Sequence, residues 1–221
     1  MSNKQERVTP VYYTLKEELL SAVTHGIGGL FGIYALLRML ILSARNGNAW
    51  SVVASAIYGA SLIILYTIST LSHALTHRGA KKVFRVLDHA TIFLLIAGTY
   101  TPVALITLHG GLGWTIFGIQ WGIAALGIVL GSISLNRFKR ISSLIYLVMG
   151  WAIIIALYPL IHSIDPAGFF YLLGGGVFYS AGLIFYHIRI TYSHFIWHLL
   201  VLIGSVLQFI AVVQYVLPTT F

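Results

Sequence analysis

The chain contains no cysteine and few charged residues, and both shortages limit what it can be. Without cysteine there are neither disulfides nor thiolate ligands, so any metal ion would be held by histidine or carboxylate side chains. Charged residues make up 8% of the 221 residues and hydrophobic residues 58%, whereas a soluble domain carries roughly 25% charged residues. This composition predicts an integral membrane protein without a large soluble domain.

Seven apolar segments are long enough to cross a membrane, which takes about 20 residues each. Helices are the expected structure, because backbone polar groups in lipid must be paired within the segment. The sequence therefore predicts an all-α seven-transmembrane-helix bundle over residues 19–221, preceded by a cytoplasmic N-terminal segment at residues 1–18. The predicted spans are Leu19 to Leu42, Trp50 to Leu75, Leu87 to Leu108, Leu112 to Leu135, Ile141 to Ile161, Gly168 to Tyr186, and His194 to Leu217.

The basic residues predict the orientation of the bundle, because cytoplasmic connectors carry an excess of Lys and Arg. Leaving out Arg38 inside the first span, only Arg45 falls on one side. The opposite side holds the N-terminus, which is therefore predicted to be cytoplasmic, with the C-terminus outside. Although the net charge is +8, this distribution is typical of membrane topology and argues against nucleic-acid binding. The basic residues on the N-terminal side are Lys4, Arg7, Lys16, Arg78, Lys81, Lys82, Arg85, Arg137, Lys139, Arg140 and Arg189.

Glycine pairs and two prolines predict details of the packing. Small residues four apart let transmembrane helices approach closely, so the pairs are interpreted as ordinary bundle contacts. Pro102 and Pro159 are expected to interrupt the third and fifth spans. The glycine pairs are Gly28 with Gly32, Gly118 with Gly122, and Gly127 with Gly131.

Three histidines lie at similar depth in the predicted cytoplasmic half of the bilayer. His194 and His198 are four residues apart at the start of the last span and share one helix face, and His73 lies near the end of the second span. Ionisable residues in a membrane are costly and usually face the bundle interior. The sequence thus predicts a metal site, with zinc as the expected ion. Three protein ligands and a water would make it catalytic, and a fourth protein ligand structural.

Alternatives to this ligand set remain open at the level of sequence. His77 follows His73 by four residues and competes with it, but it stands next to Arg78 in an expected watery connector. For His194 and His198, the alternative is a pair without a metal ion. The remaining histidines are interpreted as packing or interfacial residues that hydrogen-bond across helices. They are His25, His89, His109, His162 and His187.

Two further polar residues are candidates for catalysis. Ser69 precedes His73 by four residues and lies on the same helix face, where it can orient a ligand or a water. Asp88, near the predicted start of the third span, can accept a proton from water. The alternative for Asp88 is a helix cap, because a carboxylate suits a helix N-terminus. Glu17 and Glu18 lie at the same depth, and no role is predicted for them.

Four motifs in their order along the chain resemble the hemolysin III family, the bacterial branch of the progestin and adipoQ receptor superfamily. They are E-E-L-L-S-A-V-T-H-G-I-G from Glu17, S-T-L-S-H ending at His73, F-R-V-L-D-H-A around Asp88, and H-F-I-W-H from His194. The resemblance covers the chain from Glu17 to the end of the last span. One departure is Ser21, which stands where the first motif often has Asn.

The resemblance implies seven helices with a cytoplasmic N-terminus in a bacterial cell membrane. It implies zinc on His73, His194 and His198, with Ser69 beside the ligands and Asp88 beside the water on the metal. Related receptors and ceramidases point to hydrolysis of lipid amides, so membrane lipids with an acyl chain are the expected partners. The family is also linked to haemolysis and to membrane homeostasis. A cytolysin, or a non-catalytic sensor of the membrane with structural zinc, therefore stays as an alternative to a lipid hydrolase.

Overall fold

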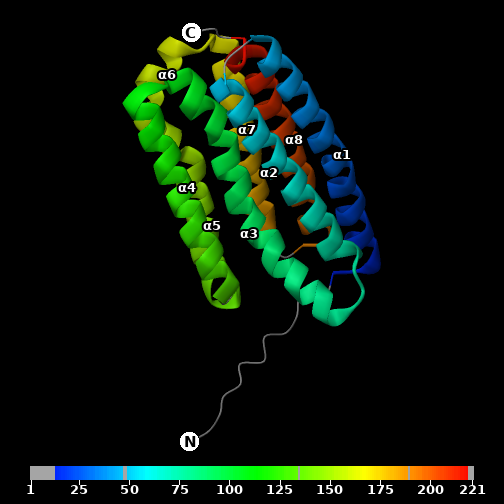
Figure 1. Ribbon diagram of the computed structural model, residues 1–221. Coiled ribbons are helices and arrows are strands. Elements are labelled where there is room, and N and C mark those ends of the chain that lie inside the picture. Colours follow the sequence, from blue (N-terminus) through cyan, green and yellow to red (C-terminus); the bar gives the residue numbers. More distant parts are fainter. Residues whose placement is uncertain (1–12, 47–48, 134, 189, 219–221) are drawn as a thin grey trace, which may run out of the picture.

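The computed structural model describes residues 13–46, 49–133, 135–188 and 190–218, and these residues fold almost entirely into helices (Figure 1). Among them, seven helical segments are long and apolar enough to cross a membrane, which confirms the all-α architecture predicted from hydropathy. The α-helices are α1 (Leu15–Asn46), α2 (Ala49–Ala74), α3 (Arg78–Pro102), α4 (Gly110–Ile133), α5 (Leu135–Trp151), α6 (Leu157–Ser163), α7 (Pro166–His187) and α8 (Ser193–Ala211). The π-helices η1 (Val103–Leu108) and η3 (Val212–Val216) extend α3 and α8, and the 3₁₀-helix η2 (Ala152–Ala156) joins α5 to α6.

Several helices begin earlier than the apolar segments that predicted them, and α1 and α3 are the two that bear on the site. Helix α1 begins at Leu15 rather than Leu19, and α3 begins at Arg78 rather than Leu87. Hydropathy marks the edge of the hydrocarbon layer, whereas a helix can continue into the polar layer beyond it. The basic run from Arg78 to Arg85, predicted to be a connector, is therefore helical.

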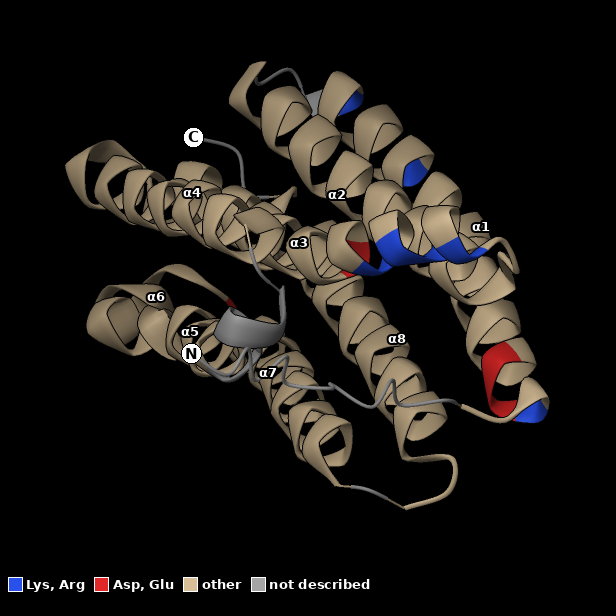
Figure 2. Cartoon of the chain, turned by 90° about the horizontal axis from the view of Figure 1, so that it is seen from below, with Lys and Arg blue, Asp and Glu red and all other residues tan. Residues whose placement is uncertain are grey.

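Helix α3 lies in the middle of the bundle (Figure 2). In its most apolar stretch 83% of the residues are buried, against 22% in α4 and 17% in α7. The outer helices expose large apolar side chains such as Leu30, Leu126 and Phe170. Since lipid covers such surfaces at little cost, this distribution is the one that a membrane bundle requires.

Glycines allow α1 and α2 to pack closely, as the first glycine pair predicted. A Cβ on Gly28 would overlap the ring of Tyr66, and one on Gly32 would lie 3.2 Å from Ile63 Cγ1. From the opposite helix, a Cβ on Gly59 would lie 2.6 Å from Leu36 Cδ1. The expectation does not hold for Gly118, Gly122 and Gly131 of α4, since a Cβ added at any of them would meet no other described atom within 4 Å.

Gly28→Ala should therefore destabilise the protein, while Gly26→Ala should not. Tyr66 is fully buried and its hydroxyl donates to Ser205 Oγ at 2.7 Å, so the ring has little freedom to move away. Overpacking of this kind costs about 1–3 kcal/mol. A Cβ on Gly26 would meet only Thr70 Cγ2 at 3.9 Å. Thermal unfolding of both variants in one detergent tests this, and equal melting temperatures would contradict it.

Both prolines lie where the α-helical hydrogen bonding is interrupted, as predicted. Pro102 ends α3 before η1, and Pro159 follows η2 within α6. Proline removes a backbone donor and crowds the preceding turn. At the break between α5 and α6, the Tyr100 hydroxyl makes hydrogen bonds to two backbone groups. It donates to Gly150 O at 2.8 Å and accepts from Ile153 N at 2.9 Å. The break is therefore stabilised from the neighbouring α3.

Candidate metal centre

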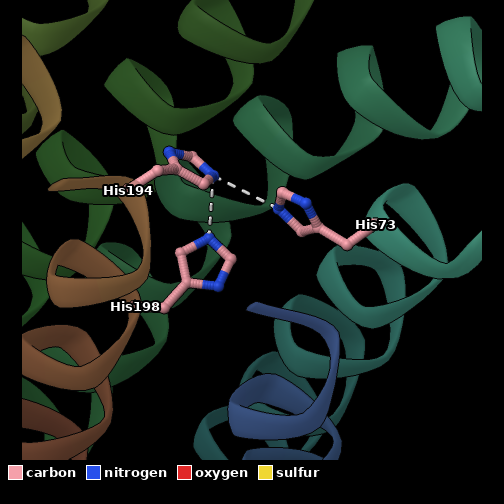
Figure 3. A group of neighbouring side chains, drawn as sticks. All are labelled: His73, His194 and His198. Atoms are coloured by element: carbon pink, nitrogen blue, oxygen red, sulfur yellow. Dashed lines mark hydrogen bonds between the residues drawn. The ribbon is translucent and has the colours of Figure 1, made fainter. Parts of the chain in front are cut away.

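Three imidazoles meet at the end of the bundle where α2 ends and α1, α3 and α8 begin. His73 comes from the last turn of α2, and His194 and His198 come from the first turns of α8 (Figure 3). His194 Nε2 lies 3.2 Å from His73 Nε2 and 3.0 Å from His198 Nε2. The three residues are exposed by only 9%, 8% and 1% in sequence order. The structure thus brings together the three predicted ligands, which we call the histidine cluster.

The spacing of these nitrogens suits a single metal ion. Zinc binds imidazole nitrogen at about 2.0–2.1 Å, so tetrahedral ligands lie roughly 3.3 Å from one another. Each of the three histidines offers a ligand atom, and these atoms all lie within 4.8 Å of one another. Since no thiolate is available, the donor set consists of nitrogen, which suits zinc and neighbouring transition metals.

Hydrogen bonds alone would satisfy the histidine cluster poorly. His73 Nδ1 lies 2.6 Å from Glu18 Oε2. Because a carboxylate only accepts, Nδ1 carries a proton and the neutral ring presents a lone pair at Nε2. His194 Nε2 carries either one proton or one lone pair, so it cannot both donate to His73 and accept from His198. A cation would accept three lone pairs at once.

Glu18 contacts the histidine cluster, although the sequence predicts no role for it. Its Oε2 accepts from His73, and its Oε1 lies 2.9 Å from Lys81 Nζ of α3. The carboxylate therefore touches a predicted ligand directly. The available signal was its depth, which is the same as that of the histidines, but depth does not show which way a side chain points.

The rings of Tyr13 and His25 stack on the imidazoles of His194 and His198. His25 of α1 stacks on His198, with ring centroids 3.7 Å apart and 14° between the planes. Tyr13 stacks on His194 at 4.5 Å and 23°. Burial raises the pKa of the Tyr13 hydroxyl above its usual value, with Arg85 opposing the shift. His25 is thus a packing residue, as predicted, but it packs on a predicted ligand.

Glu17 fixes the same end of α1 to the connector before α8. Its Oε2 accepts from Thr14 N at 2.8 Å and from Thr14 Oγ1 at 2.9 Å, while Thr14 Oγ1 accepts from Glu17 N at 3.3 Å. This reciprocal pair is a capping box. Glu17 Oε1 accepts from Tyr192 N at 2.7 Å, two residues before His194. The non-glycine residue Tyr192 has a φ of 63°, and this bond helps to hold it in the left-handed region.

Asp88 and Ser69 both face a small cavity of about 20 Å³ beside the histidine cluster. Asp88 Oδ2 accepts from Ser72 Oγ at 3.3 Å. The Ser69 hydroxyl is buried and has no hydrogen-bond partner within the described residues. Asp88 lies inside α3, far from its N-terminus, so the interpretation of Asp88 as a helix cap is wrong. The catalytic roles of both residues remain predictions.

His77 has a different task from His73. It is the N-cap of α3, and its Nδ1 accepts from Ala80 N at 3.3 Å. It is not among the residues that meet in the histidine cluster. His89 has the predicted role across helices, because its Nε2 lies 2.7 Å from Tyr186 Oη of α7. His162 is exposed, and its Nδ1 donates to Tyr158 O at 2.8 Å within α6 rather than across helices. The two ring nitrogens of His25, in contrast, lack partners within the described residues.

Apolar cavities extend from the histidine cluster toward the opposite end of the bundle. One of about 100 Å³ shares Leu65, Ile92, Trp197 and Val201 with the small cavity. A further one of about 300 Å³ adjoins it and shares Thr99, Tyr100, Gly150, Trp151, Gly176 and Gln208 with it. Both are lined mainly by apolar atoms. The lining of the first comes mostly from α3, α5, α7 and α8, and that of the second mostly from α3, α5, η2, α6 and α7. A chain-like apolar group would suit this space better than a compact polar one.

The chain is similar to known bacterial proteins of one family. The family described as haemolysin-III related matches residues 13–209. The chain is 46% identical to "Hemolysin-3" of Bacillus cereus, covering 97% of this chain and 98% of that protein. It is 45% identical to the "Hemolysin-3 homolog" of Bacillus subtilis, covering 95% and 99%. The human "Monocyte to macrophage differentiation factor" is 26% identical over 85% of this chain and 81% of its own, which fits the superfamily inferred from the motifs. No solved structure matches.

Proposed function

The chain belongs to the haemolysin-III-related family of multi-pass bacterial membrane proteins, and from this premise we propose that it is a zinc-dependent hydrolase of lipid amide or ester bonds that serves membrane homeostasis. The observation that carries the proposal is the histidine cluster at the end of an apolar cavity system. A donor set of three nitrogens leaves a coordination position open, which is typical of catalytic rather than structural zinc.

The residues in and beside the histidine cluster have separate roles in the proposed hydrolysis. Zinc supplies a Lewis acid that polarises a carbonyl and makes water a nucleophile near neutral pH. His73, His194 and His198 would hold the ion, and the Asp88 carboxylate in the adjoining cavity would take the proton from the attacking water. The Ser69 hydroxyl, which bonds to no other residue in the described part of the chain, is available to hydrogen-bond water or the substrate carbonyl in the same cavity.

The orientation that we propose places this chemistry in the cytoplasmic leaflet. The start of α1 and the first turns of α3 lie together at the lower end of the bundle in Figure 1. The histidine cluster lies at this same end, because α2 ends and α8 begins there. They bear Lys16, Arg78, Lys81, Lys82 and Arg85. Arg45 lies in the last turn of α1, at the opposite end. Positive connectors favour the cytoplasmic side, which puts the N-terminus there and the C-terminus outside.

The apolar cavities would take the acyl chain of the substrate. Gly176 of α7 lines both of the larger cavities, and a Cβ there meets nothing within 4 Å. A leucine at this position would have room for its Cβ and would place its larger side chain in the lining of the acyl space. On α4, Gly118 has equally open surroundings and does not line these cavities, so it offers a matched control.

A lipid hydrolysis assay with these variants tests the proposal. Purified protein in lipid nanodiscs should release fatty acid from N-acyl or O-acyl lipids, and removal of metal with a chelator should stop the release until zinc is added back. Gly176→Leu should slow turnover of long-chain substrates at least about tenfold while sparing short-chain ones, since one pocket methylene is worth up to about 1–3 kcal/mol. Gly118→Leu should behave as wild type. Absence of fatty acid release from every amide and ester lipid would reject the hydrolase.

Cytolysis is the second candidate, and the name of the Bacillus cereus relative is the observation in its favour. It is separable from hydrolysis, because lysis by pore formation does not need the histidine cluster. Erythrocytes exposed to wild-type protein and to His198→Ala would lyse equally if pore formation is the function.

A further inference from the structure

Helix α1 contributes none of the three imidazoles, yet Glu18 in its first turn lies closer to one of them than the imidazole nitrogens lie to one another. Glu18 Oε2 lies 2.6 Å from His73 Nδ1. The side chains are exposed by only 15% and 7%, so water competes little for this bond. The proton on Nδ1 leaves the lone pair of His73 on Nε2, the atom that faces His194.

Lys81 fixes the other oxygen of the same carboxylate. Its Nζ lies 2.9 Å from Glu18 Oε1, and it comes from the first turn of α3. One carboxylate thus joins α1 to α2 and α3 at the depth of the histidine cluster. With both oxygens engaged, Glu18 has one orientation, and it transmits that orientation to the imidazole ring.

We propose that Glu18 is the positioning residue of the metal centre: it holds His73 in the tautomer and ring orientation that present Nε2 to the ion. Ligand imidazoles commonly donate their second N–H to a carboxylate, which fixes the ring and makes the ligand more basic. The inference rests on the metal site of the proposed function, but it concerns affinity for the ion and does not depend on which bond is hydrolysed.

A purely structural role for Glu18 makes different demands on the variants. If the carboxylate only ties α1 to α3, removing Lys81 would be as harmful as removing Glu18. If it positions His73, Lys81→Met matters little, because the bond from Glu18 to His73 remains. Glu18→Gln keeps one oxygen that accepts from Nδ1 but loses the charge and the acceptor that faces Lys81, so it should be partly effective.

Metal titration of the full-length protein in detergent micelles separates these roles. Zinc affinity is measured by competition with a chromophoric chelator, and the cobalt(II) absorption spectrum reports the ligand geometry. Glu18→Ala should bind zinc about 10–100-fold more weakly than wild type and shift the cobalt spectrum. The zinc affinity of Glu18→Gln should lie between those of wild type and Glu18→Ala. The affinity of Lys81→Met should stay within about threefold of wild type, well below the loss expected for Glu18→Ala.

Two results would overturn the assignment of Glu18. One is wild-type zinc affinity together with an unchanged cobalt spectrum in Glu18→Ala. The other is a loss in Lys81→Met equal to that in Glu18→Ala. Because Glu18→Gln preserves the shape and one acceptor, it keeps the test decisive even if the alanine variant unfolds. Tight, Glu18-dependent metal binding without any lipid turnover would reject the hydrolase and leave the positioning role intact.

Discussion

Purified wild-type protein is expected to carry about one zinc ion per chain, and His73→Ala to carry almost none. His73 contributes one of the three nitrogens of the histidine cluster. Its loss should cost more than the 10–100-fold in affinity that removal of an outer partner such as Glu18 costs. His198→Ala should have the same effect, since His198 Nε2 lies 3.0 Å from His194 Nε2. Elemental analysis of protein purified without chelator measures the content directly.

His77→Ala is the matched control for this experiment. His77 lies four residues after His73 but caps α3 instead of joining the cluster. Its replacement should leave the zinc content unchanged and lower stability by about 0.5–2 kcal/mol, the cost of a lost N-cap. Zinc that survives in His73→Ala, or that disappears in His77→Ala, would show that the metal sits elsewhere.

The seven spans and the histidine cluster were both predictable from the sequence, for the same physical reason. Lipid forces backbone pairing into helices, so hydropathy alone counts the spans. It also makes buried imidazoles costly, so His73, His194 and His198 stood out by depth. The four-residue spacing of the last two fixed them on one helix face without knowledge of the neighbouring helices.

The contacts of α1 could not be predicted, because they depend on the rotation of one helix against another. Glu18 and Glu17 are adjacent, yet one reaches His73 and the other reaches Tyr192 N. Hydropathy cannot decide between them, since both are acids at one depth. For the same reason the sequence left His25 as an ordinary packing residue, although its ring lies flat on His198.

The start of α3 shows a second limit of hydropathy. Hydropathy predicts a connector for the basic run before Leu87, which makes Asp88 a candidate helix cap. In the structure the helix begins at Arg78, so Asp88 projects from within it toward the small cavity. The earlier start also brings Lys81 onto the helix, where it reaches Glu18.

Asp88→Asn is expected to keep the metal and lose most of the turnover. The carboxylate lines the small cavity together with His194 and His198, and Ser72 Oγ donates to it at 3.3 Å. General-base catalysis contributes about 10²–10⁴-fold, so kcat on the best lipid substrate should fall within that range. Asparagine has nearly the same shape, and the zinc content should therefore remain near one per chain.

Ser72→Ala separates the charge of Asp88 from its orientation. This change removes the donor to Asp88 Oδ2 and leaves the carboxylate in place. A hydrogen bond to a charged group contributes about 1.5–3 kcal/mol. Because Ser72 Oγ also donates to Ser69 O at 2.9 Å, the longer bond to Asp88 should lie at the lower end of this range, which corresponds to roughly a tenfold loss of kcat. A zinc-loaded Asp88→Asn protein with wild-type turnover would exclude Asp88 as the base. A protein that loses its zinc on this substitution would instead make the carboxylate a fourth ligand, and a closed four-ligand site is the arrangement of structural zinc.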